Sequence, residues 1–154
     1  MRDIFSHYVS MVCMILTFII CFMFTFVNIE VSYAKSYHTA VVEQVSDTNL
    51  SEGAIKRLSN DVIGASLASD GEKAEYRSLV AKGTGASGFS RDRLSSAEKE
   101  RYDKLNARMW RIDVDRNLDA RTTDSGGARV TLTYHIPVPI FNQMITGTLV
   151  GYAY

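Results

Sequence analysis

A single uncharged and strongly apolar stretch occupies the amino end of the chain. From Ile4 to Ile29 there is no Asp, Glu, Lys or Arg, and Asp3 and Glu30 bound the stretch. An apolar helix needs about 20 residues to cross a hydrocarbon core about 30 Å thick. A lone segment in lipid must satisfy its own backbone hydrogen bonds, so it has to be helical. The sequence therefore predicts one membrane-spanning helix over about residues 8–29.

Two fates of this segment are compatible with the sequence. Ser32-Tyr33-Ala34 matches the small-x-small pattern of a signal-peptide cleavage site. However, the apolar core of a signal peptide is only about 7–15 residues long, which favours a retained anchor. The basic residues Arg2 and Lys35 nearly balance across the span. Because only a short amino end remains on the other side, we expect a single-pass protein of the cell membrane with an extracytoplasmic carboxyl-terminal domain.

Small and weakly polar residues recur at steps of three and four along the predicted span. They are Ser10, Cys13, Thr17, Cys21, Thr25 and Asn28. This spacing places them on one face of a helix. One interpretation is a helix-packing face for a second copy or another membrane protein, since small residues let helices approach closely in lipid. The other is that the hydroxyls bond back to their own helix, and the absence of GxxxG leaves both open.

The periodicity of the chain predicts an α+β fold with three regions. No Gly or Pro occurs from Met1 to Ser51, and apolar residues step by four from Ile29 to Val45, so the helix should continue as an amphipathic stem. The regions are an anchor and stem at 1–48, a helical segment with loops at 49–108, and a small antiparallel sheet of about three strands at 109–154.

The helical segment is predicted to consist of short elements. In order, we expect a helix from Ser51, a turn at Ser69–Gly71, a helical piece around Tyr76, a flexible loop at Lys82–Gly88 and a helix at Ala97–Arg108. Ser95 and Glu98 have the spacing of a capping box, which marks the start of the last helix. Because apolar residues are sparse in that helix, we expect it to be a solvated surface element.

Period-two alternation predicts the strands. Residues 110–114 alternate apolar and polar side chains, and Arg129–Ile136 is β-branched and aromatic. Pro137-Val138-Pro139 should end regular pairing, because proline has no N–H to donate. Thr146–Tyr154 should form the last strand. The aromatic residues Trp110, Tyr134, Tyr152 and Tyr154 are expected to be core and sheet residues, and His135 to be a surface residue.

One acidic cluster is a candidate metal site. Asp113, Asp115, Asn117, Asp119 and Asp124 fall at positions 1, 3, 5, 7 and 12 of a calcium-loop pattern. Position 6 is Leu118 instead of glycine, and position 12 is Asp instead of Glu. The favoured interpretation is that these residues form the wet face of a strand, with calcium binding as the alternative. No cofactor is expected.

Several function classes are disfavoured. Asp124–Gly127 resembles the surroundings of a serine nucleophile, but His7 and His38 lie on the anchor and stem, leaving only His135 as a base. We therefore expect no catalytic residues and no enzyme. The formal net charge of zero gives no electrostatic case for nucleic-acid binding. Both cysteines lie in the apolar stretch, so the rest of the chain offers no thiolate for zinc or a disulfide.

The carboxyl end carries a family resemblance. Thr131–Phe141 (TLTYHIPVPIF), followed by a last strand, resembles the strand-then-proline segment of TadE-like pseudopilins, and the whole plan is similar to type IV pilin-like proteins. The resemblance implies a non-enzymatic component of a pilus, secretion or conjugation apparatus, whose partners are similar membrane proteins or further copies of itself. The start of the chain departs from the family, because it lacks the glycine and the glutamate of a pilin processing site.

The same sequence features are also compatible with a second function. A membrane-tethered extracytoplasmic binding or sensor domain would also have one anchor and one small domain. Asp113, Asp115 and Asn117 would make such a domain calcium-dependent. A response of thermal stability to calcium separates the two functions, because a ligand that binds only the folded state stabilises it.

Overall fold

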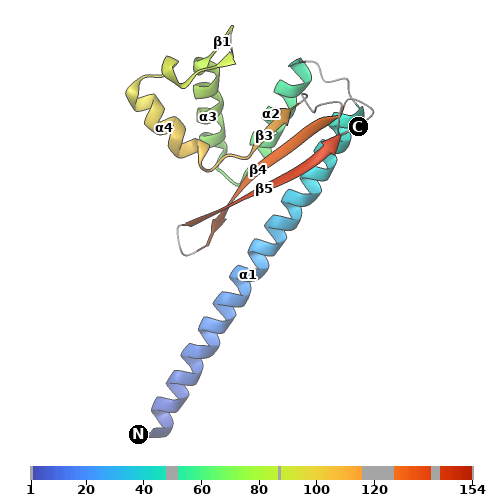
Figure 1. Cartoon of the computed structure of the whole chain (residues 1–154). Helices are drawn as coiled ribbons and strands as arrows, with labels where there is room; N and C mark the ends of the chain where they lie inside the picture. The colour runs from blue at the N-terminus through green and yellow to red at the C-terminus, as the bar shows by residue number, and fades with distance from the viewer. Residues whose placement is uncertain (1, 48–51, 87, 116–126, 140–142, 154) are drawn as a thin grey trace.

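One long helix runs through the whole molecule. The computed structural model describes residues 2–47, 52–86, 88–115, 127–139 and 143–153. Helix α1 (Arg2–Asp47) spans 46 residues, and its amino-terminal half projects alone from the rest of the chain (Figure 1). This confirms the predicted apolar helix that continues as a stem. The physical reason is that no Gly or Pro interrupts the i to i−4 hydrogen bonding over this range.

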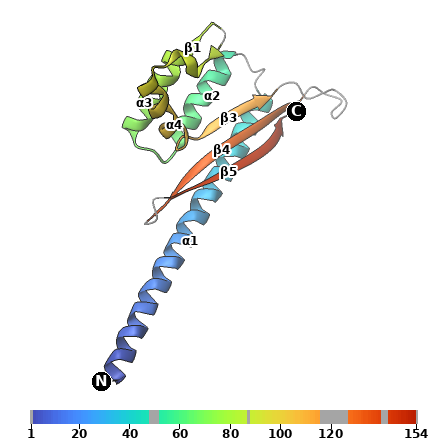
Figure 2. The ribbon, with the colours of Figure 1, turned by 60° about the vertical axis from the view of Figure 1, so that its left-hand side comes forward.

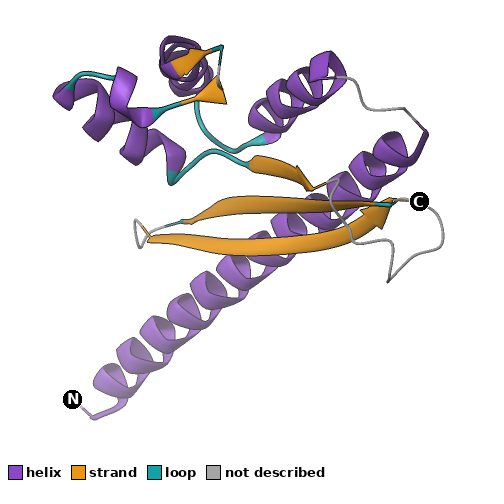
Figure 3. Cartoon of the chain, turned by 45° about the horizontal axis from the view of Figure 1, so that its top comes forward, coloured by secondary structure: helices purple, strands orange, loops and turns teal. Residues whose placement is uncertain are grey.

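Three antiparallel strands form the sheet, which confirms the predicted α+β layout. They are β3 (Arg111–Asp115), β4 (Ala128–Val138) and β5 (Gln143–Ala153), in the order β3-β4-β5. In the ladder, Ile112 pairs with Leu132, and Leu132 pairs with Leu149. Figure 3 shows β4 and β5 as a long hairpin that packs against α1. Strand β5 begins three residues earlier than the predicted Thr146.

The carboxyl half of α1 and one face of the sheet share a hydrophobic core. The buried residues of β4 on this face are Val130, Leu132, Tyr134 and Ile136, which follow the period-two spacing of one strand face. Those of α1 are Ala34, Val41 and Val45. Trp110 is fully buried beside them, and its Nε1–H donates to the His135 carbonyl oxygen at 3.0 Å. The stem is therefore an integral part of the domain.

Helix α2 (Glu52–Ala65) covers the same core from a second side. Its Leu58 packs with Val41 and Val45, and its Val62 packs with Ala34 and Trp110. Leu58 and Val62 lie four residues apart, so they occupy one face of the helix. This confirms the helix that the sequence predicted in this part of the chain.

Helices α3 (Asp70–Gly83) and α4 (Ser96–Asn106) form a second, smaller core with the carboxyl end of α2 (Figure 2). Its buried members are Ile63, Tyr76, Leu79, Leu94, Leu105 and Met109. Helix α4 is largely solvated, as predicted, but Leu105 is buried and Tyr102 stacks on Tyr76 at a centroid distance of 5.5 Å. The helix therefore packs through a narrow apolar stripe.

Capping boxes begin both of these helices. The Ser95 hydroxyl accepts from the Glu98 N–H, and the Glu98 carboxylate accepts from the Ser95 N–H, which confirms the predicted box. Ser69 and Glu72 make the same reciprocal bonds at α3. The predicted turn at Ser69–Gly71 was therefore wrong. Ser69 is an N-cap, and Asp70 and Gly71 belong to the first helical turn, where an N-cap satisfies free backbone N–H groups.

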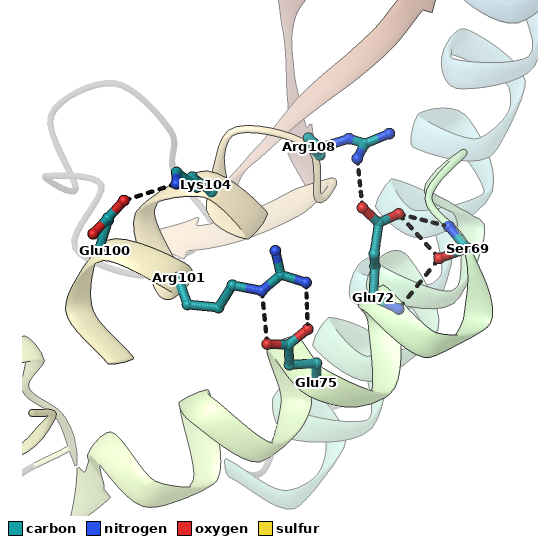
Figure 4. A network of polar contacts seen from close by, with 7 residues as sticks. All are labelled: Ser69, Glu72, Glu75, Glu100, Arg101, Lys104 and Arg108. Carbon is teal, nitrogen blue, oxygen red and sulfur yellow. Dashed lines mark hydrogen bonds and ion pairs between the residues drawn. The ribbon is translucent and has the colours of Figure 1, made fainter. Parts of the chain in front are cut away.

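Ion pairs join α3 to α4 and to the turn that follows α4 (Figure 4). The Arg101 guanidinium donates to both carboxylate oxygens of Glu75, at 2.7 and 2.8 Å, and Arg108 pairs with Glu72. Exposed pairs of this kind contribute only about 0–1 kcal/mol each. They orient α4 on α3, while the buried stripe supplies most of the stabilisation.

The predicted flexible loop at Lys82–Gly88 was wrong in part. Lys82 and Gly83 end α3, and β1 (Thr84–Gly85) pairs antiparallel with β2 (Gly88–Phe89). The Arg93 guanidinium donates to the Gly88 carbonyl oxygen at 3.1 Å, which holds this short hairpin against the chain that follows. The Arg93 side chain, which lies outside residues 82–88, thus holds the hairpin in place. The composition of residues 82–88 does not indicate this contact.

The expectation that Pro137 ends regular pairing was also wrong. Strand β4 continues to Val138, and Pro137 pairs with Met144. The reason is the length of β3, whose first residue Arg111 lies opposite Thr133. Beyond Thr133, β4 has a strand on one side only, and a proline is tolerated at such a local edge.

Candidate functional site

The amino-terminal half of α1 is the most unusual surface of the described chain. It is apolar and uncovered, with Met14, Phe18 and Phe24 exposed by 69%, 72% and 71%. Within α1, the segment Ser6–Asp47 contains an 18-residue window with a mean hydropathy of 2.5, and none of this window is buried inside the protein. Leaving such side chains in water forgoes about 1.5–3 kcal/mol each. This one helix is long and apolar enough to span a membrane.

The structure gives three polar groups on the candidate helix-packing face a partner within their own helix. The hydroxyls of Thr17 and Thr25 each donate at 2.8 Å to the carbonyl oxygen four residues earlier, and the Asn28 amide does the same to Phe24. These donors therefore do not need a second helix. What remains for helix packing is the small size of Ser10, Cys13, Thr17, Cys21 and Thr25, which allows close backbone approach.

The candidate face points away from the protein's own domain. At about 100° per residue, the stripe from Ser10 to Asn28 centres about 120° around α1 from the side that carries Ala34, Val41 and Val45. Those three side chains are buried, whereas the residues of the stripe are exposed. A second helix could therefore lie along the stripe without meeting the domain.

The structure describes two of the five residues of the candidate calcium site. Asp113 and Asp115 lie on the exposed face of β3, while Ile112 and Val114 are half-buried on the other face. Asn117, Asp119 and Asp124 lie outside the described residues. Within the described ranges, no group of three or more His, Cys, Asp or Glu side chains is placed to hold a metal ion. The two described aspartates match the wet strand face expected from the sequence.

The prediction of a surface position for His135 was wrong, because its side chain is buried. Its Nδ1 lies 2.9 Å from the Thr146 hydroxyl, and its Nε2 has no partner among the described residues. Burial, with a smaller effect of the Arg111 charge, lowers the pKa of the imidazole. Leu67 and Arg108, which are distant in the sequence, line the same small pocket as His135. The alternation of residues along a strand does not indicate that distant parts of the chain will bury a polar residue such as His135.

The aromatic residues divide between core and surface. Trp110 and Tyr134 are core residues, as expected, with ring centroids 6.1 Å apart. Tyr152 lies in β5 but is 48% exposed, and Tyr154 lies outside the described residues. Among the described residues, Trp110, Tyr134 and Tyr152 therefore do not form a single ligand-binding surface.

One feature missed by the sequence analysis is the absence of charge in the β4–β5 hairpin. From Val130 to Tyr154 the chain contains no Asp, Glu, Lys or Arg. The signal is plain in the sequence, but its meaning depends on where the hairpin lies relative to α1. Figures 1 and 2 both show the end of β4 and the start of β5 directed toward the amino-terminal half of that helix.

Comparisons with known protein families, with curated proteins and with solved structures find no match to this chain. The resemblance to TadE-like pseudopilins thus remains an expectation from the sequence. Three features of the described chain bear on its function: the apolar half of α1, the small-residue stripe on that half, and the uncharged β4–β5 hairpin.

Proposed function

We propose that this protein is a single-pass, membrane-anchored structural or assembly component of a pilus, secretion or conjugation apparatus, similar to a pseudopilin and without catalytic activity. The observation that carries the proposal is the continuity of α1. Its amino half is an uncovered apolar helix, and its carboxyl half supplies Ala34, Val41 and Val45 to the core of the domain. A partner that moves or rotates the anchor would therefore move the domain with it.

The burial of Ala34 supports retention of the anchor. Ala34 is fully buried, and it packs in the cluster that includes Val62, Trp110 and Leu132. Cleavage after Ala34 would detach Val31 and Ala34 from that cluster. A signal peptide is discarded before the mature domain is complete, so it does not ordinarily contribute core residues. In the retained form, the cell membrane holds the helix and the domain lies on the extracytoplasmic side.

Self-association through the small-residue stripe is the simplest assembly contact. The stripe is exposed and lies away from the domain, so two copies could meet through it while both domains stay outside the contact. Small residues allow the close helix approach that van der Waals packing in lipid requires. The same stripe would serve for a different pilin-like or secretion-apparatus membrane protein.

Cysteine crosslinking of the full chain in its own membrane tests this proposal. Cys13 and Cys21 are native reporters on the stripe, and mild oxidation should give a disulfide-linked dimer through one or both of them. A Thr17→Leu substitution should reduce the crosslink, because added bulk separates the helices. Val12→Leu is the matched control, since residue 12 lies on the opposite side of α1 and should leave the crosslink unchanged.

A second control tests whether contact is specific to one face. In a Cys13→Ser, Cys21→Ser background, Ile19→Cys places a thiol at a similar depth on the opposite side of the helix. We expect little crosslinking from this position. Equal crosslinking from both sides, or none from the stripe while the protein is in the membrane, would remove self-association from the proposal.

A calcium-dependent binding or sensor domain is the second candidate. The observation in its favour is that Asp113 and Asp115 are exposed on the same face of β3. If the domain binds calcium, millimolar calcium should raise the melting temperature of the full chain in detergent, and Asp113→Asn should abolish the rise. An unchanged melting temperature would eliminate this candidate and leave the assembly role.

A further inference from the structure

The β4–β5 hairpin lies against α1 in a defined direction. At one end, the His38 Nε2 lies 3.3 Å from the carbonyl oxygen of Val130, and a Cβ atom built on Gly151 would lie only 2.7 Å from Val42 Cγ2. Closer to the amino end of α1, Phe26 packs against the cluster of Ala34, Val62, Trp110, Leu132, Tyr134 and Ile136, and Figures 1 and 2 show β4 running toward that end of the helix. As β4 proceeds from Val130 to Ile136, it therefore follows α1 back toward the amino terminus.

These contacts fix the level of the hairpin along the helix. From His38 to Phe26 the axis of α1 advances about 18 Å. From Val130 to Ile136 the strand advances about 20 Å, so the two elements run close to antiparallel. Two more strand residues, to Val138, add about 7 Å. The end of the hairpin, defined here as Pro137–Pro139 and Gln143–Ile145, therefore lies level with about residues 22–26 of α1.

That level falls inside the uncharged stretch of α1, which ends at Ile29 before Glu30. A hydrocarbon core needs about 20 residues, and the stretch Ile4–Ile29 is somewhat longer. If the first part of the stretch fills the core, the hairpin end meets the edge of the hydrocarbon. If the last part fills it, the hairpin end lies about 5–10 Å deeper, which is the depth of interfacial membrane segments.

The chemistry of the hairpin end fits the boundary between headgroups and hydrocarbon. Its described residues carry no charge, and Ile145 is an apolar side chain with 38% exposure. Beyond Thr133, however, one edge of β4 has no pairing strand in the described sheet. Unpaired backbone groups are too costly for the hydrocarbon centre, so this edge needs the water of the headgroup layer.

We propose that the end of the β4–β5 hairpin is a second membrane contact, seated in the lipid interface beside α1. The inference rests on the proposed membrane anchor. It gives the protein two points of attachment, and two points fix the tilt and the rotation of the domain relative to the bilayer. The stripe on α1 is thereby presented at a defined angle to a neighbouring copy.

A depth measurement on the full chain in phosphatidylcholine vesicles tests the proposal. In the Cys13→Ser, Cys21→Ser background, an environment-sensitive fluorophore is attached at Ile145→Cys or at Val150→Cys. These two positions lie in the same strand and have similar exposure, 38% and 45%, but Val150 lies near the far end of β5. Gln143→Cys repeats the measurement at an exposed polar position of the hairpin end.

We expect blue-shifted emission and several-fold stronger quenching by shallow nitroxide lipids at 145 and 143 than at 150. Equal, water-like emission at all three positions, with the protein still floating with the vesicles, would overturn the hairpin contact and leave the anchor intact. Protein that does not float with the vesicles would overturn the anchor and the hairpin contact together.

Discussion

Gly151 is the residue whose enlargement most directly tests the joining of stem and sheet. A Cβ atom built at this position would lie 2.7 Å from Val42 Cγ2 and 2.8 Å from His38 Cε1. Both of these atoms belong to α1, whereas Gly151 belongs to β5. Replacing Gly151 with alanine therefore has to push the strand and the helix apart or displace both side chains.

The expected cost follows from these contacts. Overpacking a well-packed core costs about 1–3 kcal/mol. A displaced His38 also loses its contact with the Val130 carbonyl oxygen, and a lost hydrogen bond costs about 0.5–1.5 kcal/mol. We therefore expect Gly151→Ala to lower the free energy of unfolding by about 1.5–4.5 kcal/mol, a large part of the about 5–15 kcal/mol typical of a domain.

Urea unfolding of the full chain in a mild non-ionic detergent measures this change. Trp110 is the only tryptophan, and it is fully buried between stem and sheet, so its fluorescence reports the loss of that core. With an m-value of about 2 kcal/mol per molar urea, a cost of about 3 kcal/mol should lower the midpoint by about 1.5 M. Gly71→Ala is the control, because a Cβ there meets no atom within 4 Å.

A double substitution shows whether the cost arises at this contact. Val42→Ala removes the Cγ2 atom, so Gly151→Ala should cost less in that background, with a coupling energy of about 0.5–3 kcal/mol. Unfolding free energies that change by less than about 0.5 kcal/mol in Gly151→Ala would refute the close packing of β5 on α1. A full cost with no coupling to Val42 would refute the assigned contact.

Two further predictions concern the helical segment. Ser69→Ala should lower the free energy of unfolding by about 0.5–2 kcal/mol because it removes the N-cap of α3. Ser90 precedes the short 3-10 helix Arg91–Arg93 and makes no side-chain capping bond, so Ser90→Ala should cost less; thermal melting followed by circular dichroism compares the two variants. The Lys82 ammonium and the Ser95 N–H lower the pKa of Glu98 from 4.5 to about 2, so its stabilising contribution is complete above pH 4.5 and is lost as the pH falls toward 2. Glu98→Gln should flatten the acid limb of the stability curve over that range, and an unchanged limb would contradict this assignment.

The sequence by itself determined the features that arise from composition and local period. An uninterrupted run of apolar residues without Gly or Pro gives one long helix, and alternation around Ile112 and Leu132 gives strands with one buried face. Likewise, Ser95 and Glu98 mark a helix start because the capping bonds lie within four residues. In each case the physical cause acts between neighbours in the chain.

Only the tertiary structure decided which surfaces are covered. His135 is buried where Leu67 and Arg108, from the segments that follow α2 and α4, line the same pocket, and Pro137 stays in β4 because β3 is short. The level of the uncharged hairpin on α1 also depends on contacts such as that of His38 with Val130, 92 residues apart. Burial and edge position depend on packing between distant segments, and local periodicity carries no information about which segments will meet.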